Sequence, residues 1–165
     1  MMKIRNGFTL VETMVAISIT LLLGTTIMVA VNGFLTREKS NQTANEMISL
    51  LNSARNYAVT RQGPAGYDMN FVKIILTTDG MITAYPGKGA GVGTSYFSKD
   101  ISSDSITVTA INNGDLQFAA GSGKLVNLDG TSRDSTYSIG VTVSDGDHDD
   151  DKVVYISSFG TVTLK

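Results

Sequence analysis

A run of 24 residues without a charged side chain, residues 13–36, dominates the N-terminal part of the chain. As a helix rising about 1.5 Å per residue, this run would extend about 36 Å, more than the roughly 30 Å hydrocarbon core of a bilayer. Lys3 and Arg5 precede the run, so the N-terminus is expected to stay in the cytoplasm while the rest of the chain is exported. The sequence therefore predicts a single membrane-spanning helix.

Two features argue against a cleaved secretory signal peptide. Residues 30–33, Ala-Val-Asn-Gly, only approximate the small-x-small cleavage site of such a signal. A carboxylate, Glu12, also stands at the start of the apolar run. A charge at mid-membrane costs about 2.5–3.5 kcal/mol on insertion scales, and less near the interface. Glu12 is therefore expected to pair with another group or to have a functional role.

The sequence GFTLVE at residues 7–12, after a basic leader and before a long apolar helix, resembles the signature of type IV pilin precursors. The resemblance implies that a prepilin peptidase cuts between Gly7 and Phe8 and methylates the new amine of Phe8. It also implies that Glu12 is a subunit-assembly residue, which pairs with the N-terminal amine of a neighbouring subunit. Such a pair would remove two desolvation penalties at once in an apolar environment.

The helix is expected to continue past the apolar run as an amphipathic segment, which Gly63 and Pro64 end. Six apolar residues recur there at the spacing of one helix face: Ala44, Met47, Ile48, Leu51, Ala54 and Ala58.

Beyond residue 66 the pattern changes to short strands separated by turn residues. Asp79-Gly80 and Asn113-Gly114 are hairpin signals, which predict that strand 69–78 pairs with 81–85 and strand 105–111 with 116–119. Further strands are expected at 137–144, 152–158 and 161–164.

These patterns predict an α+β fold, in which a long N-terminal helix packs on an antiparallel β-sheet domain as in pilins. The expected parts are a leader peptide at 1–7, a transmembrane or filament-core helix at 8–36, an amphipathic helix at 37–62 and the β domain at 63–165.

Two later segments make the resemblance specific to one family of pilin-like proteins. Residues 50–62, LLNSARNYAVTRQ, are similar to the L-x-x-A-R-x-x-A-x-x-R pattern of the GspH/FimT family, which comprises pseudopilin H and FimT-type minor pilins. Residues 116–121 and 154–162 look like the C-terminal strands of that family. Residues 13–36 lack the proline of many major pilins, and the chain has no cysteine for a disulfide-closed loop. Both departures favour a minor pilin or pseudopilin.

The resemblance implies a non-enzymatic subunit in the bacterial inner membrane, with one membrane pass and a periplasmic domain, that enters a pilus or pseudopilus. The first expectation is a minor pseudopilin in the tip complex that primes a type II secretion pseudopilus. The alternatives are a FimT/FimU-type minor pilin of a type IV pilus, a competence pilin that captures DNA, and a simple membrane-anchored binding domain. Implied partners are other pilins or pseudopilins of the tip complex and filament, the prepilin peptidase and methylase, and the inner-membrane assembly platform.

Charge and composition argue against nucleic acid and against catalysis. Beyond Gln62 the chain has 7 basic and 12 acidic residues. It therefore lacks the excess of basic residues that binding to a phosphate backbone needs. There is no cysteine, and the single histidine, His148, lies in an acidic segment. We therefore expect no catalytic residue, no metal and no cofactor.

Two further motifs have plainer interpretations. The glycine-rich residues 87–94 lack the spacing of phosphate-binding loops, so they are predicted to form a mobile surface loop. Asp145, Asp147 and Asp149 have the D-x-D-x-D spacing of calcium loops, but Asp150 replaces the glycine at the sixth position and Ile156 the glutamate at the twelfth. A solvated loop between two strands is expected, with calcium binding as the alternative.

Overall fold

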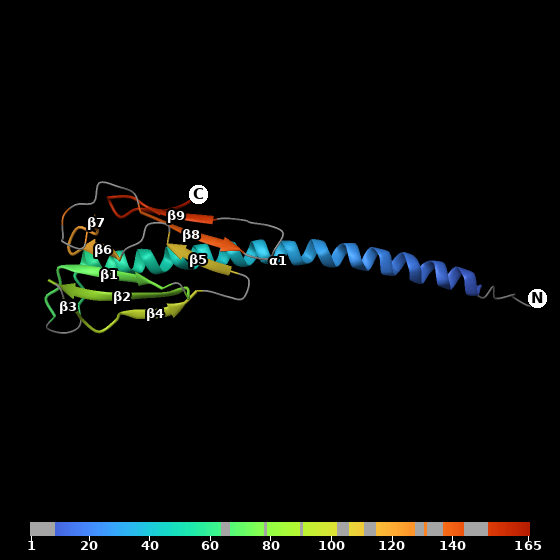
Figure 1. The fold of residues 1–165 in the computed structure, drawn as a ribbon, viewed down its shortest axis with the longest axis horizontal. Coiled ribbons are helices and arrows are strands. Elements are labelled where there is room, and N and C mark those ends of the chain that lie inside the picture. The colour runs from blue at the N-terminus through green and yellow to red at the C-terminus, as the bar shows by residue number, and fades with distance from the viewer. Residues whose placement is uncertain are drawn as a thin grey trace, which may run out of the picture. The chain divides into compact units, whose positions relative to one another are not determined.

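The computed structural model describes residues 9–63, 67–77, 79–89, 91–101, 106–110, 115–127, 131, 137–143 and 152–165. The chain divides into two compact units, residues 1–35 and 36–165. The described part holds one long helix, α1 (Leu10–Thr60), and ten strands (Figure 1). The strands are β1 (Phe71–Leu76), β2 (Met81–Lys88), β3 (Gly91–Val92), β4 (Phe97–Asp100), β5 (Ile106–Ala110), β6 (Leu116–Ala119), β7 (Leu125–Val126), β8 (Tyr137–Val143), β9 (Lys152–Ile156) and β10 (Val162–Leu164).

Helix α1 ends in a left-handed cap. Arg61 has a φ of 51°. Its N–H donates to the Ala58 carbonyl at 3.3 Å, and the N–H of Gln62 donates to the Tyr57 carbonyl at 3.2 Å. This pair of hydrogen bonds is the Schellman arrangement, which satisfies carbonyls that the end of a helix otherwise leaves without a partner.

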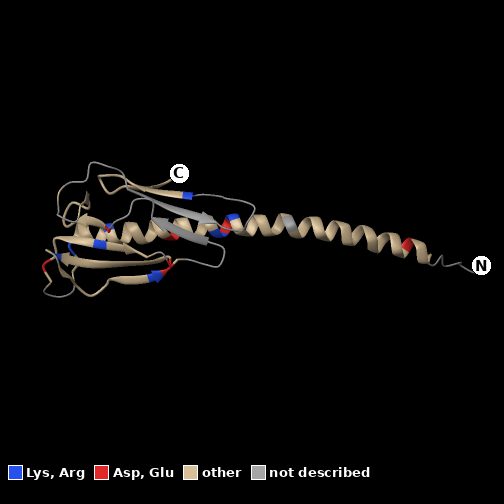
Figure 2. Ribbon diagram, in the orientation of Figure 1, with Lys and Arg blue, Asp and Glu red and all other residues tan. Residues whose placement is uncertain are grey.

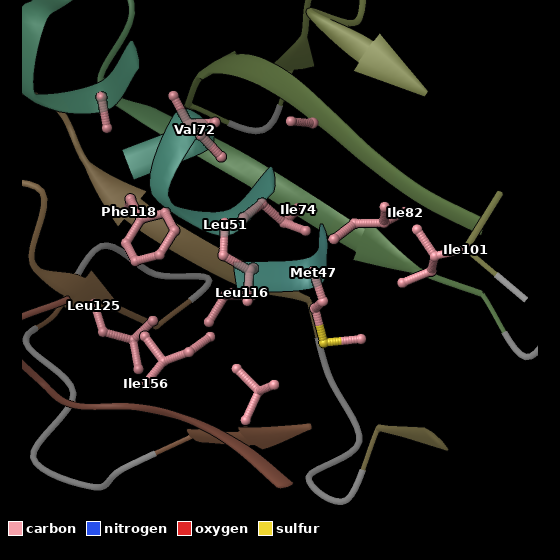
Figure 3. Close-up of a cluster of buried hydrophobic side chains, with 14 of the residues drawn as sticks. Met47, Leu51, Val72, Ile74, Ile82, Ile101, Leu116, Phe118, Leu125 and Ile156 are labelled. Carbon is pink, nitrogen blue, oxygen red and sulfur yellow. The ribbon is translucent and has the colours of Figure 1, made fainter. Parts of the chain in front are cut away.

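The predicted apolar stripe of α1 is confirmed as the centre of the core. Five of its six members are fully buried, and the sixth, Ile48, is partly buried against the same cluster. Leu51 lies among Val72 and Ile74 of β1, Phe118 of β6 and Ile156 of β9 (Figure 3). The stripe therefore packs against strands from far along the chain.

The strands form two antiparallel sheets. In the first, the order is β3-β2-β1-β6-β7, and β4 also pairs with β2. In the second, the order is β10-β9-β8-β5. Both sheets supply residues to one core cluster, since Val154 and Ile156 of β9 belong to it together with β1, β2 and β6 residues. The predicted α+β fold, a long helix packed on antiparallel strands, is confirmed, and the structure adds the division into two sheets.

The hairpin predicted at Asp79-Gly80 is confirmed. Strands β1 and β2 pair in antiparallel register, from Phe71 opposite Gly87 to Leu76 opposite Ile82. Gly80 has a φ of 79°, a conformation that glycine adopts without steric cost.

The hairpin predicted at Asn113-Gly114 is wrong. Strand β5 pairs with β8 in the second sheet, whereas β6 pairs with β1 and β7 in the first. Leu116 and Phe118 of β6 lie opposite Ile74 and Val72 and are buried with them. Strand β6 pairs with β1 because its apolar side chains are buried there. A turn motif cannot predict this pairing, since the two strands are far apart in the sequence.

The two strands that flank the acidic segment pair as expected. Strands β8 and β9 are antiparallel, with Tyr137 opposite Ile156 and Val141 opposite Lys152. The predicted last strand is also confirmed, because β10 pairs with β9. Residues 144–151 between β8 and β9 lie outside the described residues.

The interpretation of residues 87–94 as a mobile loop is wrong. Gly87 and Lys88 end β2 and pair with Val92 and Gly91 of β3. A Cβ atom on Gly87 would overlap the ring of Phe71 on β1, so glycine allows the ring to pack closely against the backbone there. Gly87 and Gly91 therefore belong to a paired edge of the first sheet.

Arg55 of α1 links a turn from each sheet. Its Nε donates to the Gly123 carbonyl in the β6–β7 turn at 3.4 Å, and its Nη2 donates to the Phe159 carbonyl in the β9–β10 turn at 3.5 Å. The Leu125 N–H also donates to the Ser158 carbonyl at 3.0 Å. Gly160, with a φ of 78°, packs directly against the Gly123 carbonyl.

We predict that Gly160→Ala destabilises the domain far more than Gly89→Ala. Both glycines have positive φ, but a Cβ on Gly160 would overlap the Gly123 carbonyl oxygen, whereas a Cβ on Gly89 has no atom within 4 Å. The free energy of unfolding should fall by at least about 3 kcal/mol for Gly160→Ala and by about 1 kcal/mol for Gly89→Ala. Urea unfolding of the chain in detergent micelles measures both, and equal losses would contradict the packing described for Gly160.

Candidate functional site

The start of α1 is a reciprocal cap formed by Thr9 and Glu12. The Glu12 N–H donates to Thr9 Oγ1 at 3.3 Å, and the Thr9 N–H donates to Glu12 Oε2 at 3.4 Å. Thr9 is the residue before the first helical residue, and Glu12 is the third residue of the helix. The T-x-x-E spacing is that of a capping box, which satisfies two N–H groups that a helix start leaves without intrahelical acceptors.

The position of Glu12 also suits its charge. A carboxylate in the first turn of a helix interacts favourably with the partial positive charge of the helix N-terminus. Glu12 is exposed in the isolated chain, and no charged residue lies between it and Arg37 (Figure 2). It is therefore a single carboxylate on an otherwise uncharged helix surface.

The residues on either side of Glu12, and those up to residue 35, expose an apolar surface all round the helix. Leu10 is 76% exposed, and the large apolar side chains between residues 11 and 35 whose exposure is described are also exposed. A helix that is apolar on every side is one that lipid or other helices bury. By length and composition, α1 is the one helix in the described part of the chain that could cross a membrane.

Hydroxyl groups in this apolar segment are satisfied within the helix. Thr13, Ser18, Thr20, Thr25 and Thr26 each donate a hydrogen bond to a carbonyl three or four residues earlier, at 2.8–2.9 Å. A polar group in hydrocarbon needs such a partner, because no water is available there. These residues therefore do not oppose burial of the segment in lipid or in a bundle of helices.

Of the three residues predicted to form the processing and assembly site, the structure describes only Glu12. Gly7 and Phe8 lie outside the described residues. The role of Thr9 as the partner of Glu12 was missed at the sequence level, although its T-x-x-E signal is readable there.

Metal binding by the acidic segment stays untested. Asp145, Asp147, Asp149 and His148 lie outside the described residues. Among the residues that are described, no group of three or more His, Cys, Asp or Glu side chains could hold a metal ion.

A known sequence family matches the N-terminal site. The family described as "Prokaryotic N-terminal methylation motif" matches residues 2–28, which include the predicted cleavage position, Glu12 and the first two thirds of the apolar run. The match covers the N-terminal motif, and the fold described above is a pilin-like α+β fold.

A solved structure with the same fold is the minor pseudopilin EpsH from the Type 2 Secretion System of Vibrio cholerae. The two chains superpose with a TM-score of 0.56, over 77% of this chain and 96% of EpsH, at 9% sequence identity. The likeness therefore concerns the fold. A comparison with curated protein sequences gives no significant match.

The capping box makes a testable prediction about the first turn of α1. Thr9→Val removes the hydroxyl that accepts from the Glu12 N–H, which should destabilise the first turn by about 1 kcal/mol. Exchange of the Glu12 amide hydrogen should then be about fivefold faster in detergent micelles. Thr9→Ser keeps a hydroxyl at the same place and should exchange at the wild-type rate. Equal acceleration in the two variants would argue against the cap.

Proposed function

We propose that this chain is a minor pseudopilin, a structural subunit of a type II secretion pseudopilus that acts in the complex priming the filament. The observation that carries the proposal is the N-terminal end of α1, where one carboxylate precedes a long apolar surface that none of the described residues covers. The pilin-like fold of the rest of the chain supports it. The proposed role is assembly through this helix and includes no enzymatic step.

In the proposed life cycle, the chain is made as a precursor with its leader in the cytoplasm. The prepilin peptidase removes residues 1–7 and methylates Phe8, while the apolar segment holds the subunit in the inner membrane. The domain beyond residue 36 lies in the periplasm. The assembly platform of the inner membrane then transfers the subunit into the tip of the pseudopilus, beside other pseudopilins. An apolar helix behind a methylation motif is consistent with this inner-membrane route.

Glu12 is proposed to exchange its partner during assembly. In the isolated chain, its carboxylate accepts a hydrogen bond from the neutral Thr9 N–H, at 3.4 Å. The amine of a neighbouring Phe8 would provide a charge-assisted bond, which is about twice as strong as a bond between neutral groups. In an apolar surrounding this pairing also removes two desolvation costs. The exchange would therefore favour the assembled state and set the register between subunits.

A minor pilin of the FimT/FimU type in a type IV pilus is the second candidate. The methylation motif and the pilin-like fold suit a pilus subunit as well as a pseudopilus subunit, so secretion and piliation must be measured in the same cells. A DNA-capturing competence pilin is third, because the domain beyond Gln62 is acidic, with 7 basic against 12 acidic residues.

The first prediction from this function concerns processing. A peptidase must bring its catalytic groups close to the carbonyl of Gly7, and a side chain there would obstruct the approach. Gly7→Val should therefore leave full-length precursor in the membrane. Mass spectrometry of the wild-type mature protein should find an N-terminal methylated Phe8. A mature N-terminus at Met1, or beyond residue 30, would overturn the proposal.

The second prediction separates the charge of Glu12 from its role in the cap. Glu12→Gln keeps a side chain that can complete the capping box but removes the charge needed to pair with an amine. The variant should insert and be cleaved, yet fail to co-purify with its partner subunits from solubilised membranes, and secretion should be lost. Glu12→Leu should behave alike, and Glu12→Asp should be partly defective because its carboxylate is withdrawn by one methylene.

The control for this experiment is Thr9→Val, which weakens the cap and leaves the charge of Glu12 intact. If Glu12→Gln assembles normally while Thr9→Val does not, then Glu12 acts through the cap and the proposed pairing with an amine is refuted.

A further inference from the structure

Two cations lie at the exposed Phe159 of the β9–β10 turn. Arg55 of α1 donates to the Phe159 carbonyl from Nη2 at 3.5 Å and to the Gly123 carbonyl from Nε at 3.4 Å. Lys124, the next residue of the β6–β7 turn, places its Nζ 5.6 Å from the centroid of the Phe159 ring. The ring itself is open to solvent, since Phe159 is 68% exposed.

Arg61, the residue after the end of α1, adds a third cation at the same turns. A Cβ atom on Gly121 would lie 3.1 Å from Arg61 Nη2, so this guanidinium lies against the β6–β7 turn. Arg61 and Lys124 are exposed, and Arg55 is half-buried. All of these residues belong to the second unit. We call the group of Arg55, Arg61, Lys124 and Phe159 the basic patch.

The cations of the basic patch have no carboxylate partner among the described residues. Arg55 donates to backbone carbonyls, which carry no net charge. Neither Arg61 nor Lys124 forms an ion pair with a residue of the described ranges. Three lysines of the first sheet, by contrast, are each ion-paired: Lys73 with Asp115, Lys88 with Asp68 and Lys99 with Glu46. The patch therefore keeps its positive charge.

The segments that build the patch contain no acidic residue. Residues 47–62, 116–127 and 153–165 hold none, although the whole chain has 15 acidic against 13 basic residues. The positive potential of the patch is therefore not cancelled by its own segments. Cations that lie close together repel each other, so the arrangement becomes favourable once an anion lies between them.

We propose that the basic patch is the docking site for a short acidic segment of another protein, in which carboxylates stand beside an apolar side chain. Guanidinium groups bind carboxylates with paired, charge-assisted hydrogen bonds. The apolar side chain would cover the exposed ring of Phe159, and arginine and aromatic residues are both enriched at protein interfaces. The inference goes beyond the proposed function and does not depend on it, because the patch lies outside the apolar segment of α1.

A short acidic segment suits the patch better than nucleic acid or lipid does. A nucleic acid would extend past three cations, over a domain that beyond Gln62 has 7 basic against 12 acidic residues. The C-terminal end of α1 is also roughly 36 Å of helix away from residue 36, where the predicted membrane segment ends. This separation disfavours the lipid around that segment as the occupant.

Two labelled acidic peptides test the inference on the full chain in detergent micelles. The peptide DDLDDF carries carboxylates and apolar side chains, and DDSDDS carries the carboxylates alone. In an anisotropy titration, Lys124→Glu should weaken the binding of DDLDDF at least about tenfold, because it reverses a charge in the patch. Its thermal unfolding should be unchanged, since Lys124 is exposed.

Two further variants separate the parts of the patch. Arg61→Asn removes a charge and keeps a residue that tolerates a positive φ, and it should also weaken the binding of DDLDDF. The wild type should bind DDLDDF more tightly than DDSDDS, and Phe159→Ser should abolish this difference. Equal binding of the two peptides by the wild type would refute the role of Phe159 and with it the proposed segment.

Lys165→Glu is the matched control. Lys165 is exposed like Lys124, and its Nζ lies 5.5 Å from the centroid of the Tyr155 ring, but it is not part of the basic patch. The variant changes the net charge as Lys124→Glu does and loses the same kind of ring contact, so it should bind DDLDDF like the wild type. Equal losses in the two variants would overturn the inference. It would also be overturned if the wild type bound DDLDDF no more tightly than Lys124→Glu.

A photo-crosslinking residue at Ser122, which is exposed in the β6–β7 turn, identifies the occupant in cells. Mass spectrometry should map the crosslink to an acidic segment of another protein, and Lys124→Glu should lose it. Exchange of the carboxylates of that segment for lysine should restore the crosslink to Lys124→Glu. A crosslink to lipid, to nucleic acid, to a second copy of this chain or to a segment without acidic residues would overturn the proposal.

Discussion

Burial of one face of α1 is the interaction on which the rest of the domain depends. Ala44, Ala54 and Ala58 are fully buried on that face. Because alanine is small, large side chains such as Phe118 and Ile156 can pack close to the helix axis. Strands from both sheets meet at this face, and Arg55 on the same helix joins a turn from each sheet. The helix therefore organises two sheets, and the described strands of one sheet do not pair with those of the other.

The same helix has a second apolar region that no part of the described structure covers. In residues 44–58 the apolar residues form one stripe, which a folded domain can bury completely. In residues 13–36 they surround the helix, and no single sheet could cover such a surface. The difference in pattern distinguishes a segment that folds with its own chain from one that needs lipid or other subunits. It is the physical reason why this protein is interpreted as a subunit.

Sequence patterns predicted the parts of this structure that depend on neighbours along the chain. The stripe of α1 follows from helical periodicity, and the turn at Asp79-Gly80 follows from local backbone chemistry. The pairing of β5 with β8 and of β6 with β1 could not be read in this way, because it depends on which distant apolar residues are buried together. Gly87 was misread for a similar reason. Gly87 lies against the ring of Phe71, and no local pattern reveals this contact. At the N-terminal site, Glu12 was recognised from its unusual place in an apolar run, while the structure supplied its partner, Thr9.

The pairing of Glu12 with Thr9 changes what a carboxylate at this position can mean. An unpaired charge at the edge of an apolar helix would be costly to bury without a partner from another molecule. That cost alone would favour a role in assembly. Glu12 already has an internal donor and a favourable helix terminus, so its presence is compatible with a purely local role. The two roles differ in one property, because a cap needs only an acceptor oxygen whereas an amine partner needs the negative charge. The case for assembly therefore rests on the charge of Glu12 together with the uncovered surface behind it.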